Sequence, residues 1–260
     1  MNEPLRIKTR DEQNVPITMI STFPKETINL LEMDGVTTSQ YLLENDPFEF
    51  SLDYGLDIQT TMLAFREASI LQKGGVPSMA PFPKNALFIN IFYLQGIDPM
   101  IWLAGITTSI SILHWLSFSK EVNEEIILRK LEFHLLPLSK QRPIVFISQL
   151  PKAHEILKKK ASFYGLSSLS TLLDTKTMVL SKYVEENLLW NGEKTILELF
   201  HWLGIPFNHT RWELDDICKE AHEDLHLYGK LRKQTAMMAV QYSVDLFESI
   251  NFLKDYIIEV

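Results

Sequence analysis

Three β-rich apolar runs in the sequence each lead directly into a run with helical spacing. The apolar runs cover residues 16–23, 142–150 and 177–183. In the segments that follow them, apolar residues recur every three or four positions, which indicates amphipathic helices. Strands that each lead into a helix are typical of a parallel sheet with helices on its faces. We therefore expect an α/β protein of three layers, in which helices cover a central parallel sheet.

Most of the remaining chain also has the spacing of helices. Helices are expected over residues 24–34, 37–45, 55–73, 123–136, 151–165 and 193–204, and over most of a helix-rich C-terminal part from residue 212 onward. Residues 86–94 are almost entirely apolar, so their pattern fits either a strand or a buried helix. Because no long linker rich in Gly, Ser or Pro separates these segments, we expect one domain over residues 1–260, with a flexible N-terminal segment over residues 1–15.

Residues 99–119 form a long stretch that carries no charge, and Asp98 is the only charged residue between positions 86 and 119. The stretch is just long enough to span a bilayer as a helix. Its centre holds Gly105, Thr107, Thr108, Ser109 and Ser111, which weaken insertion into lipid. We expect a buried core helix here, and a membrane-associated protein anchored through residues 99–119 is the alternative.

The overall charge and the single cysteine indicate which partners and which cellular compartment to expect. The formal net charge is −8 and the pI is about 5.4. Duplex nucleic acids bind to basic surfaces, so a nucleic acid is not expected as the main partner. Cys218 is the one cysteine, which excludes an intrachain disulfide and favours a reducing compartment. The polar N-terminus lacks the apolar core of a signal peptide, and we expect a cytoplasmic protein.

Several stretches resemble one family in the order that this family uses. Residues 21–31, STFPKETINLL, are similar to the phosphosulfate loop of cytosolic sulfotransferases. Residues 133–156 resemble that family's His-Leu-Pro segment and the strand after it, and residues 177–207 resemble its Tyr-Glu-Asp strand with the following helix. The tail GKLRKQ, residues 229–234, is similar to its closing Arg-Lys-Gly. The resemblance covers about half of the chain and implies a sulfotransferase fold related to P-loop proteins.

The resemblance also implies a cofactor and roles for particular residues. Sulfotransferases pass a sulfonate from 3′-phosphoadenosine 5′-phosphosulfate to a hydroxyl or an amine. By motif, Lys25 would stabilise the bridging oxygen and His134 would be the general base. The nucleotide would lie against a small set of residues at the loop and near the C-terminus: Pro24, Lys25, Thr27, Arg232 and Lys233.

The sequence departs from the family pattern at positions that would bind the nucleotide. Thr27 replaces the loop glycine, Glu26 stands before it, and Gln149 replaces the arginine expected on the 3′-phosphate. A carboxylate about 4 Å from a phosphosulfate repels it by roughly 1–4 kcal/mol per unit charge. The loss of an arginine fork removes about 1.5–3 kcal/mol of charged hydrogen bonding. We therefore expect a protein without a bound cofactor that has lost catalysis and acts as an interaction, scaffold or assembly subunit for protein partners. An active sulfotransferase that uses Lys25 and His134 is the alternative.

A short motif near the C-terminus suggests a metal site. His222 and His226 are one helical turn apart, with Glu223 between them, in the HExxH pattern of zinc proteases. Asp245 or Glu248 would have to supply a third ligand. The charged Asp224 occupies a position that is normally uncharged in this motif, so we expect that no metal binds.

Overall fold

The structure is a computed structural model of the chain, and it describes residues 15–108, 112–119, 121–189, 195–207, 209 and 211–260. The chain groups into two compact units. The helical unit comprises Met1–Phe82, Val184–Pro206 and Phe252–Val260, and the sheet unit comprises Pro83–Tyr183 and Phe207–Asn251. The expectation of one sulfotransferase-like domain stays a prediction about these two units together. The expected flexibility of residues 1–15 falls, except for Val15, outside the described residues.

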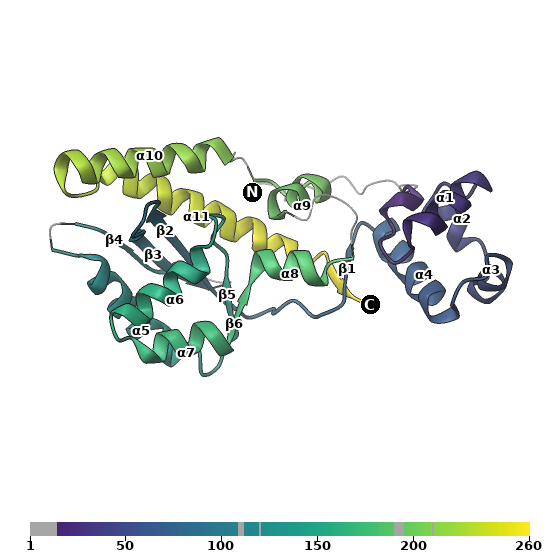
Figure 1. Ribbon diagram of the computed structural model, residues 1–260, viewed down its shortest axis with the longest axis horizontal. Coiled ribbons are helices and arrows are strands. Elements are labelled where there is room, and N and C mark those ends of the chain that lie inside the picture. The colour runs from purple at the N-terminus through teal and green to yellow at the C-terminus, as the bar shows by residue number, and fades with distance from the viewer. Residues whose placement is uncertain (1–14, 109–111, 120, 190–194, 208, 210) are drawn as a thin grey trace, which may run out of the picture. The chain divides into compact units, whose positions relative to one another are not determined.

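The helical unit consists mainly of short helices from the first part of the chain (Figure 1). Its elements are η1 (a 3₁₀ helix, Ile17–Met19), α1 (Lys25–Met33), α2 (Ser39–Leu43), α3 (Pro47–Asp53), α4 (Ile58–Gln72), β1 (Val76–Ser78), α9 (Ile196–Leu203) and β7 (Ile257–Glu259). The strands β1 and β7 pair in parallel, with Val76 opposite Ile257. The helix α8 (Leu180–Asn187) begins in the sheet unit and ends in the helical unit.

Side-chain caps set the starts of α3 and α4. The Asp46 carboxylate accepts hydrogen bonds from the backbone N–H groups of Phe48 and Glu49, and Pro47 follows it as the first helical residue. The Asp57 carboxylate accepts a hydrogen bond from the N–H of Thr60 in the same way. These caps hold the short helices in place around a common core.

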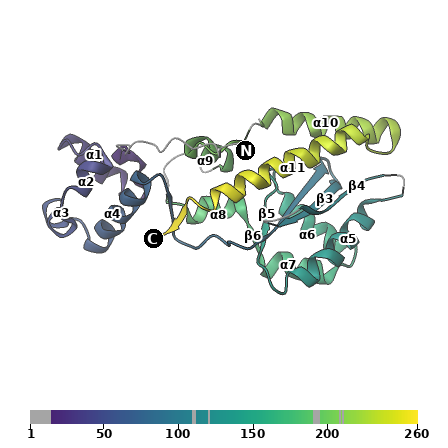
Figure 2. The same cartoon turned by 180° about the vertical axis from the view of Figure 1, so that it is seen from behind.

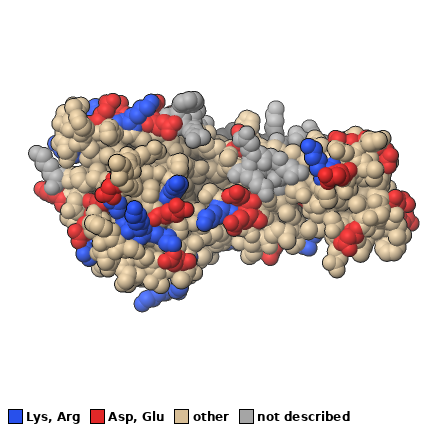
Figure 3. All heavy atoms as spheres, in the orientation of Figure 1, with Lys and Arg blue, Asp and Glu red and all other residues tan. Residues whose placement is uncertain are grey.

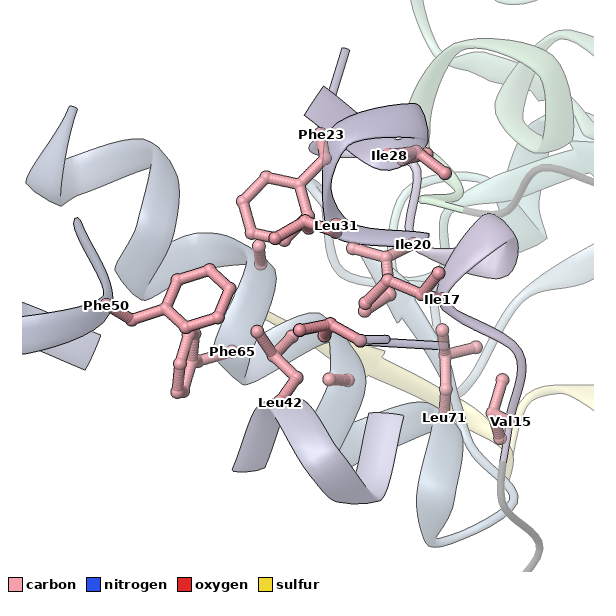
Figure 4. Close-up of a cluster of buried hydrophobic side chains, with 13 residues drawn as sticks. Val15, Ile17, Ile20, Phe23, Ile28, Leu31, Leu42, Phe50, Phe65 and Leu71 are labelled. Atoms are coloured by element: carbon pink, nitrogen blue, oxygen red, sulfur yellow. The ribbon is translucent and has the colours of Figure 1, made fainter. Parts of the chain in front are cut away.

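The core of the helical unit is a cluster of aliphatic and aromatic side chains (Figure 4). Three aromatic rings belong to it, and the Phe50 ring lies 5.5 Å from that of Phe65 and 6.5 Å from that of Phe23. Ile17 and Ile20 are fully buried beside them. Because η1 and α1–α4 each contribute only a few apolar residues, this shared cluster is what stabilises them together.

The sheet unit contains a five-stranded sheet with the strand order β4-β3-β2-β5-β6. Its elements are β2 (Leu87–Leu94), β3 (Met100–Thr108), β4 (Ile112–Ser117), α5 (Glu124–Leu138), β5 (Ile144–Phe146), α6 (Ala153–Phe163), α7 (Ser167–Thr175), β6 (Thr177–Val179), α10 (Arg211–Tyr228) and α11 (Lys233–Leu253, whose last residues belong to the helical unit). The strands β2, β5 and β6 are parallel to one another, whereas β3 and β4 are antiparallel to their neighbours.

Helices lie on both faces of this sheet, as Figures 1 and 2 show from opposite sides. On one face, Phe88 of β2 packs edge-on against Phe247 of α11, and the Asn90 amide donates a hydrogen bond to the Ser243 hydroxyl of α11. On the other face, α5 and α6 pack against β3 and β2. The predicted α/β class, with a sheet that contains parallel strands between helices, is confirmed.

The individual predicted strands fared differently. The runs at 142–150 and 177–183 contain β5 and β6, which are parallel neighbours as predicted, although each strand spans only three residues. The rest of the second predicted strand is wrong, because residues 180–183 form the start of α8. The strand predicted over residues 16–23 is wrong, because this segment forms η1 and an irregular turn. Its buried residues, Ile17, Ile20 and Phe23, recur every third position. That spacing suits a tight helical turn and not the two-residue repeat of a strand.

The long uncharged stretch is not a helix. Of residues 86–94, all but the first form β2 (Leu87–Leu94), and most of residues 99–119 forms β3 and β4, which pair antiparallel. The buried helix expected over residues 99–119 is therefore wrong, and residues 109–111 lie outside the described part. Its threonines and other β-branched residues suit a strand. In the described part of the chain, no helix combines the length and the apolar character that crossing a bilayer would need.

Candidate functional site

The turn that resembles a phosphate loop is occupied by a carboxylate of the chain itself. Glu67 of α4 is fully buried and accepts hydrogen bonds from the N–H of Ser21 at 2.5 Å, the N–H of Thr22 at 3.0 Å and the Thr22 hydroxyl at 2.6 Å. Burial raises the pKa of Glu67, and the hydrogen bonds from Thr22 and Ser21 act in the opposite direction without cancelling the shift. Two N–H groups ahead of Pro24 are thus already bound.

Sequence reasoning missed Glu67, although a signal for it was present. Glu67 follows Ala64 and Phe65 and precedes Ala68 and Leu71, all of which are buried. A carboxylate on the apolar face of a helix needs hydrogen-bond donors, since burial without partners is costly. The helical pattern thus indicates that Glu67 needs donors, although it does not indicate which residues supply them.

The residues of the phosphate-loop motif itself lie at the surface. Pro24, Lys25 and Glu26 are exposed, and Thr27 is half-buried, in the first turn of α1. The N-terminus of a helix attracts anions. Here Glu26 places a negative charge in that turn, which lowers the attraction for an anionic ligand.

The other residues implied by the family resemblance belong to the sheet unit. His134 is half-buried on α5, with its ring 5.3 Å from that of Phe133. Gln149 follows β5 and donates a hydrogen bond to the carbonyl of Ile147. Lys25 and His134, the two residues with implied catalytic roles, thus lie in different compact units.

Arg232 and Lys233 stand at the start of α11, where Arg232 has a structural role. Its guanidinium forms ion pairs with the carboxylates of Asp224 and Glu220 on α10. The fully buried Asp224 also accepts hydrogen bonds from the N–H of Arg232 and the Thr235 hydroxyl. Asp224 therefore caps α11 from the neighbouring helix, which explains the charge in the middle of the HExxH motif.

His222 and His226 lie exposed on α10, with their rings 6.4 Å apart. Among the residues that the structure describes, no three His, Cys, Asp or Glu side chains are grouped closely enough to hold a metal ion. The expectation that no metal binds stays a prediction.

Two further clusters of titratable groups serve packing. His209 lies between Glu213 and Asp245, at 2.6 Å and 2.5 Å from their carboxylates. Burial by itself lowers the pKa of His209, but the hydrogen bonds that its ring makes to Asp245 and Glu213 outweigh burial and raise the pKa, and the ring joins α10 to α11. Burial also raises the pKa of Cys218 to about 11, which leaves its thiol protonated and a poor nucleophile at neutral pH.

The second cluster holds α5 and α6 against the sheet. The buried Glu124 accepts hydrogen bonds from the N–H of Ile101 at 2.6 Å and the Tyr164 hydroxyl at 2.8 Å. The Lys160 ammonium lies 3.2 Å from Glu124 and 2.9 Å from Asp98. Burial and the hydrogen bond to Glu124 together raise the pKa of Tyr164 to about 12. All these donors and acceptors face one another, so the cluster stabilises the fold and leaves little capacity for a substrate.

A groove lies along α11 in the sheet unit. It has a volume of about 470 Å³, and its walls are mainly apolar, with Leu103, Phe118 and Met237 among the residues that line it. Arg232, which also borders it, is held by Asp224 and Glu220.

The helices α1–α4 of the helical unit carry several exposed apolar side chains. Seventeen large hydrophobic residues are exposed in the described part of the chain. Seven of them lie on α1–α4: Leu30, Met33, Tyr41, Phe48, Leu52, Ile58 and Met62. Phe48 and Leu52 are one turn apart on α3, and Ile58 and Met62 are one turn apart on α4, so each helix presents an apolar pair. Single exposed apolar residues are normal, but gathered ones mark interaction sites.

The same helices are acidic. The 40 residues between Lys25 and Arg66 contain eight Asp and Glu and no Lys, Arg or His. In the described chain, no ion pair joins any of these eight carboxylates to a cation. Red carboxylates and tan surface accordingly predominate over α1–α4, at the right of Figure 3. The candidate functional site is this surface of exposed apolar side chains and carboxylates on α1–α4.

No family model, no curated protein and no solved structure shows a match to this chain.

Proposed function

We propose that this chain is a non-catalytic interaction subunit that binds a protein partner through α1–α4. The observation that carries the proposal is the exposure of Phe48 and Leu52 on α3 and of Ile58 and Met62 on α4. Full burial of such a side chain is worth about 1.5–3 kcal/mol, and the part of each that is still exposed accounts for a fraction of this free energy. A partner that covered them would recover that free energy.

The arrangement at the phosphate-like turn supports the absence of catalysis. Glu67 already holds the N–H groups of Ser21 and Thr22, and Glu26 adds a negative charge at α1. We propose that the turn is a sulfotransferase-like loop that has lost its nucleotide, in a protein of that ancestry that needs no cofactor. The single cysteine supports a place in the reducing cytoplasm.

The first prediction concerns this nucleotide. We expect that 3′-phosphoadenosine 5′-phosphate leaves the melting temperature of the protein unchanged. A ligand bound only by the native state at a hundredfold excess over its Kd would add about 2.7 kcal/mol of stability. Differential scanning fluorimetry measures the shift. A clear rise that disappears in Lys25→Ala would instead favour the active transferase.

The second prediction concerns the binding surface. A photoreactive benzoylphenylalanine at position 48 is expected to cross-link in cells to a discrete partner, because Phe48 would lie against it. The matched control is position 133, where Phe133 on α5 is exposed to a similar degree, 72% against 60%. Gel electrophoresis and mass spectrometry identify the product. Equal products from both positions, or none from position 48, would remove the basis for assigning the interface to α3.

A further inference from the structure

We infer that the partner segment which binds α3 and α4 is a basic amphipathic helix. The inference rests on the proposed interaction function and adds the chemical class of the partner. Exposed apolar side chains such as those of α3 and α4 can bind the apolar face of a partner helix. Recognition of this kind uses partner side chains spaced three, four and seven residues apart. The negative charge beside these apolar side chains then favours a positively charged partner.

The geometry of α3 places the two kinds of side chain next to each other. Phe48 and Leu52 are one turn apart, and Glu49 and Asp53, the residues directly after them, are also one turn apart and exposed. An apolar row and an acidic row therefore run in parallel along the same helix. A helix with leucines on one face and lysines along its border fits both rows at once.

The charge of this part of the chain excludes other occupants of similar shape. These eight carboxylates, which have no ion-pair partner among the residues that the structure describes, repel phosphates, so anionic lipid surfaces and nucleic acids are disfavoured. An acidic amphipathic helix would satisfy the apolar row but would bring like charges together. A basic helix both buries the apolar row and pairs with the acidic row.

The test uses the full chain and a labelled peptide of 18 residues made of leucine and lysine, with leucines on one helical face. A second peptide has glutamate in place of every lysine. Fluorescence anisotropy measures both affinities. We expect the lysine peptide to bind at least tenfold more tightly than the glutamate peptide. Raising the salt from 50 to 500 mM should weaken the lysine peptide at least fivefold, because salt screens exposed charges.

Paired variants locate the binding. Phe48→Gln/Leu52→Gln and, separately, Glu49→Lys/Asp53→Lys should each weaken the lysine peptide at least tenfold. The matched controls are Phe133→Gln/Leu227→Gln and Glu223→Lys/Glu248→Lys, exposed residues of the sheet unit, and they should change the affinity less than twofold. Circular dichroism checks folding. If Glu49→Lys/Asp53→Lys unfolds, Glu49→Gln/Asp53→Asn replaces it. If Phe48→Gln/Leu52→Gln unfolds, Met62→Gln replaces it. Both replacements should also weaken binding of the lysine peptide.

Each contrary result has a distinct meaning. Equal affinity for both peptides, lost in Phe48→Gln/Leu52→Gln, would overturn the basic partner and leave the proposed interaction function intact. Binding that is unaffected by every α3 and α4 variant, or no binding of the lysine peptide, would also overturn the inference. A separate result, no cross-linked product from position 48 in cells, would count against the proposed function itself.

Discussion

Replacing Glu67 with leucine should lower the free energy of unfolding of the helical unit by about 3 kcal/mol. The substitution removes the acceptor for the N–H groups of Ser21 and Thr22, and a buried donor left unpaired costs about 1–3 kcal/mol. Removal of a buried charge returns part of this cost. Hydrogen exchange followed by mass spectrometry should show faster exchange in peptides that contain residues 15–33, while peptides of the sheet unit stay unchanged.

Two controls separate this role from a general effect of the substitution. Glu32→Leu removes an exposed carboxylate of α1 and should change stability by less than about 0.5 kcal/mol. Glu67→Gln keeps the shape and one acceptor oxygen, and its cost should be smaller than that of leucine. If Glu67→Leu exchanges as slowly as the wild type around residues 15–33, the carboxylate does not hold this turn.

The difference in stability between wild type and Glu67→Gln should change with pH in one direction. Burial raises the pKa of Glu67 above its ordinary value of 4.5. A raised pKa means that the folded state favours the protonated carboxyl, so this contribution is complete below pH 4.5 and falls as the pH rises through the raised pKa. The stability advantage of wild type over Glu67→Gln should therefore decrease with rising pH across that window, as measured by urea unfolding.

Replacing Lys160 with methionine should destabilise the sheet unit by about 3 kcal/mol, because it leaves the buried Glu124 without its cation. Burial by itself lowers the pKa of Lys160, but the hydrogen bond to Asp98 and the charge of Glu124 outweigh it and raise the pKa. Lys160 therefore stays charged, and its contribution is constant across neutral pH. Urea unfolding should show a lower midpoint.

The neighbouring residue provides a matched control for Lys160. Lys159 is exposed, and Lys159→Met should change stability by less than about 0.5 kcal/mol. The double variant Lys160→Met/Glu124→Met should cost less than the sum of the two single variants, since the two side chains interact directly. Additive costs would show that Lys160 acts through packing alone.

The sequence predicted the fold class for a physical reason that the structure bears out. In the sheet unit, β5 is a continuous apolar run that is fully buried, which is typical of a central parallel strand, and the half-buried β6 continues the parallel part of the sheet beside it. The turn at Ile17 to Phe23 was misread because β-branched residues suggested a strand while their three-residue spacing did not. The stretch from Met100 to Ser117 was misread because a uniformly apolar run carries no period that separates strand from helix.

Less of the candidate site than of the fold class could be predicted from the sequence. The acidic character of residues 26–65 is visible in the sequence, but exposure is not. Phe48 and Leu52 look like core residues by composition, and only the packing of Phe50 against Phe65 shows which face of α3 is buried. Glu67 illustrates the same limit, because its partners lie 45 and 46 residues earlier in the chain.

The parallel pair of β1 and β7 has a consequence for how the protein is made. Val76 emerges from the ribosome well before its partner Ile257, which follows it by 181 residues in the chain. Until then the backbone of Val76 has no β7 strand to pair with. The buried members of the cluster around Phe50 and Phe65 all precede position 72 and can assemble, although Trp202, which packs against them, comes later. During translation the nascent chain thus carries a packed α1–α4 with its acidic, apolar surface exposed before the helical unit is complete. A basic helix that binds this surface would meet it first on the ribosome.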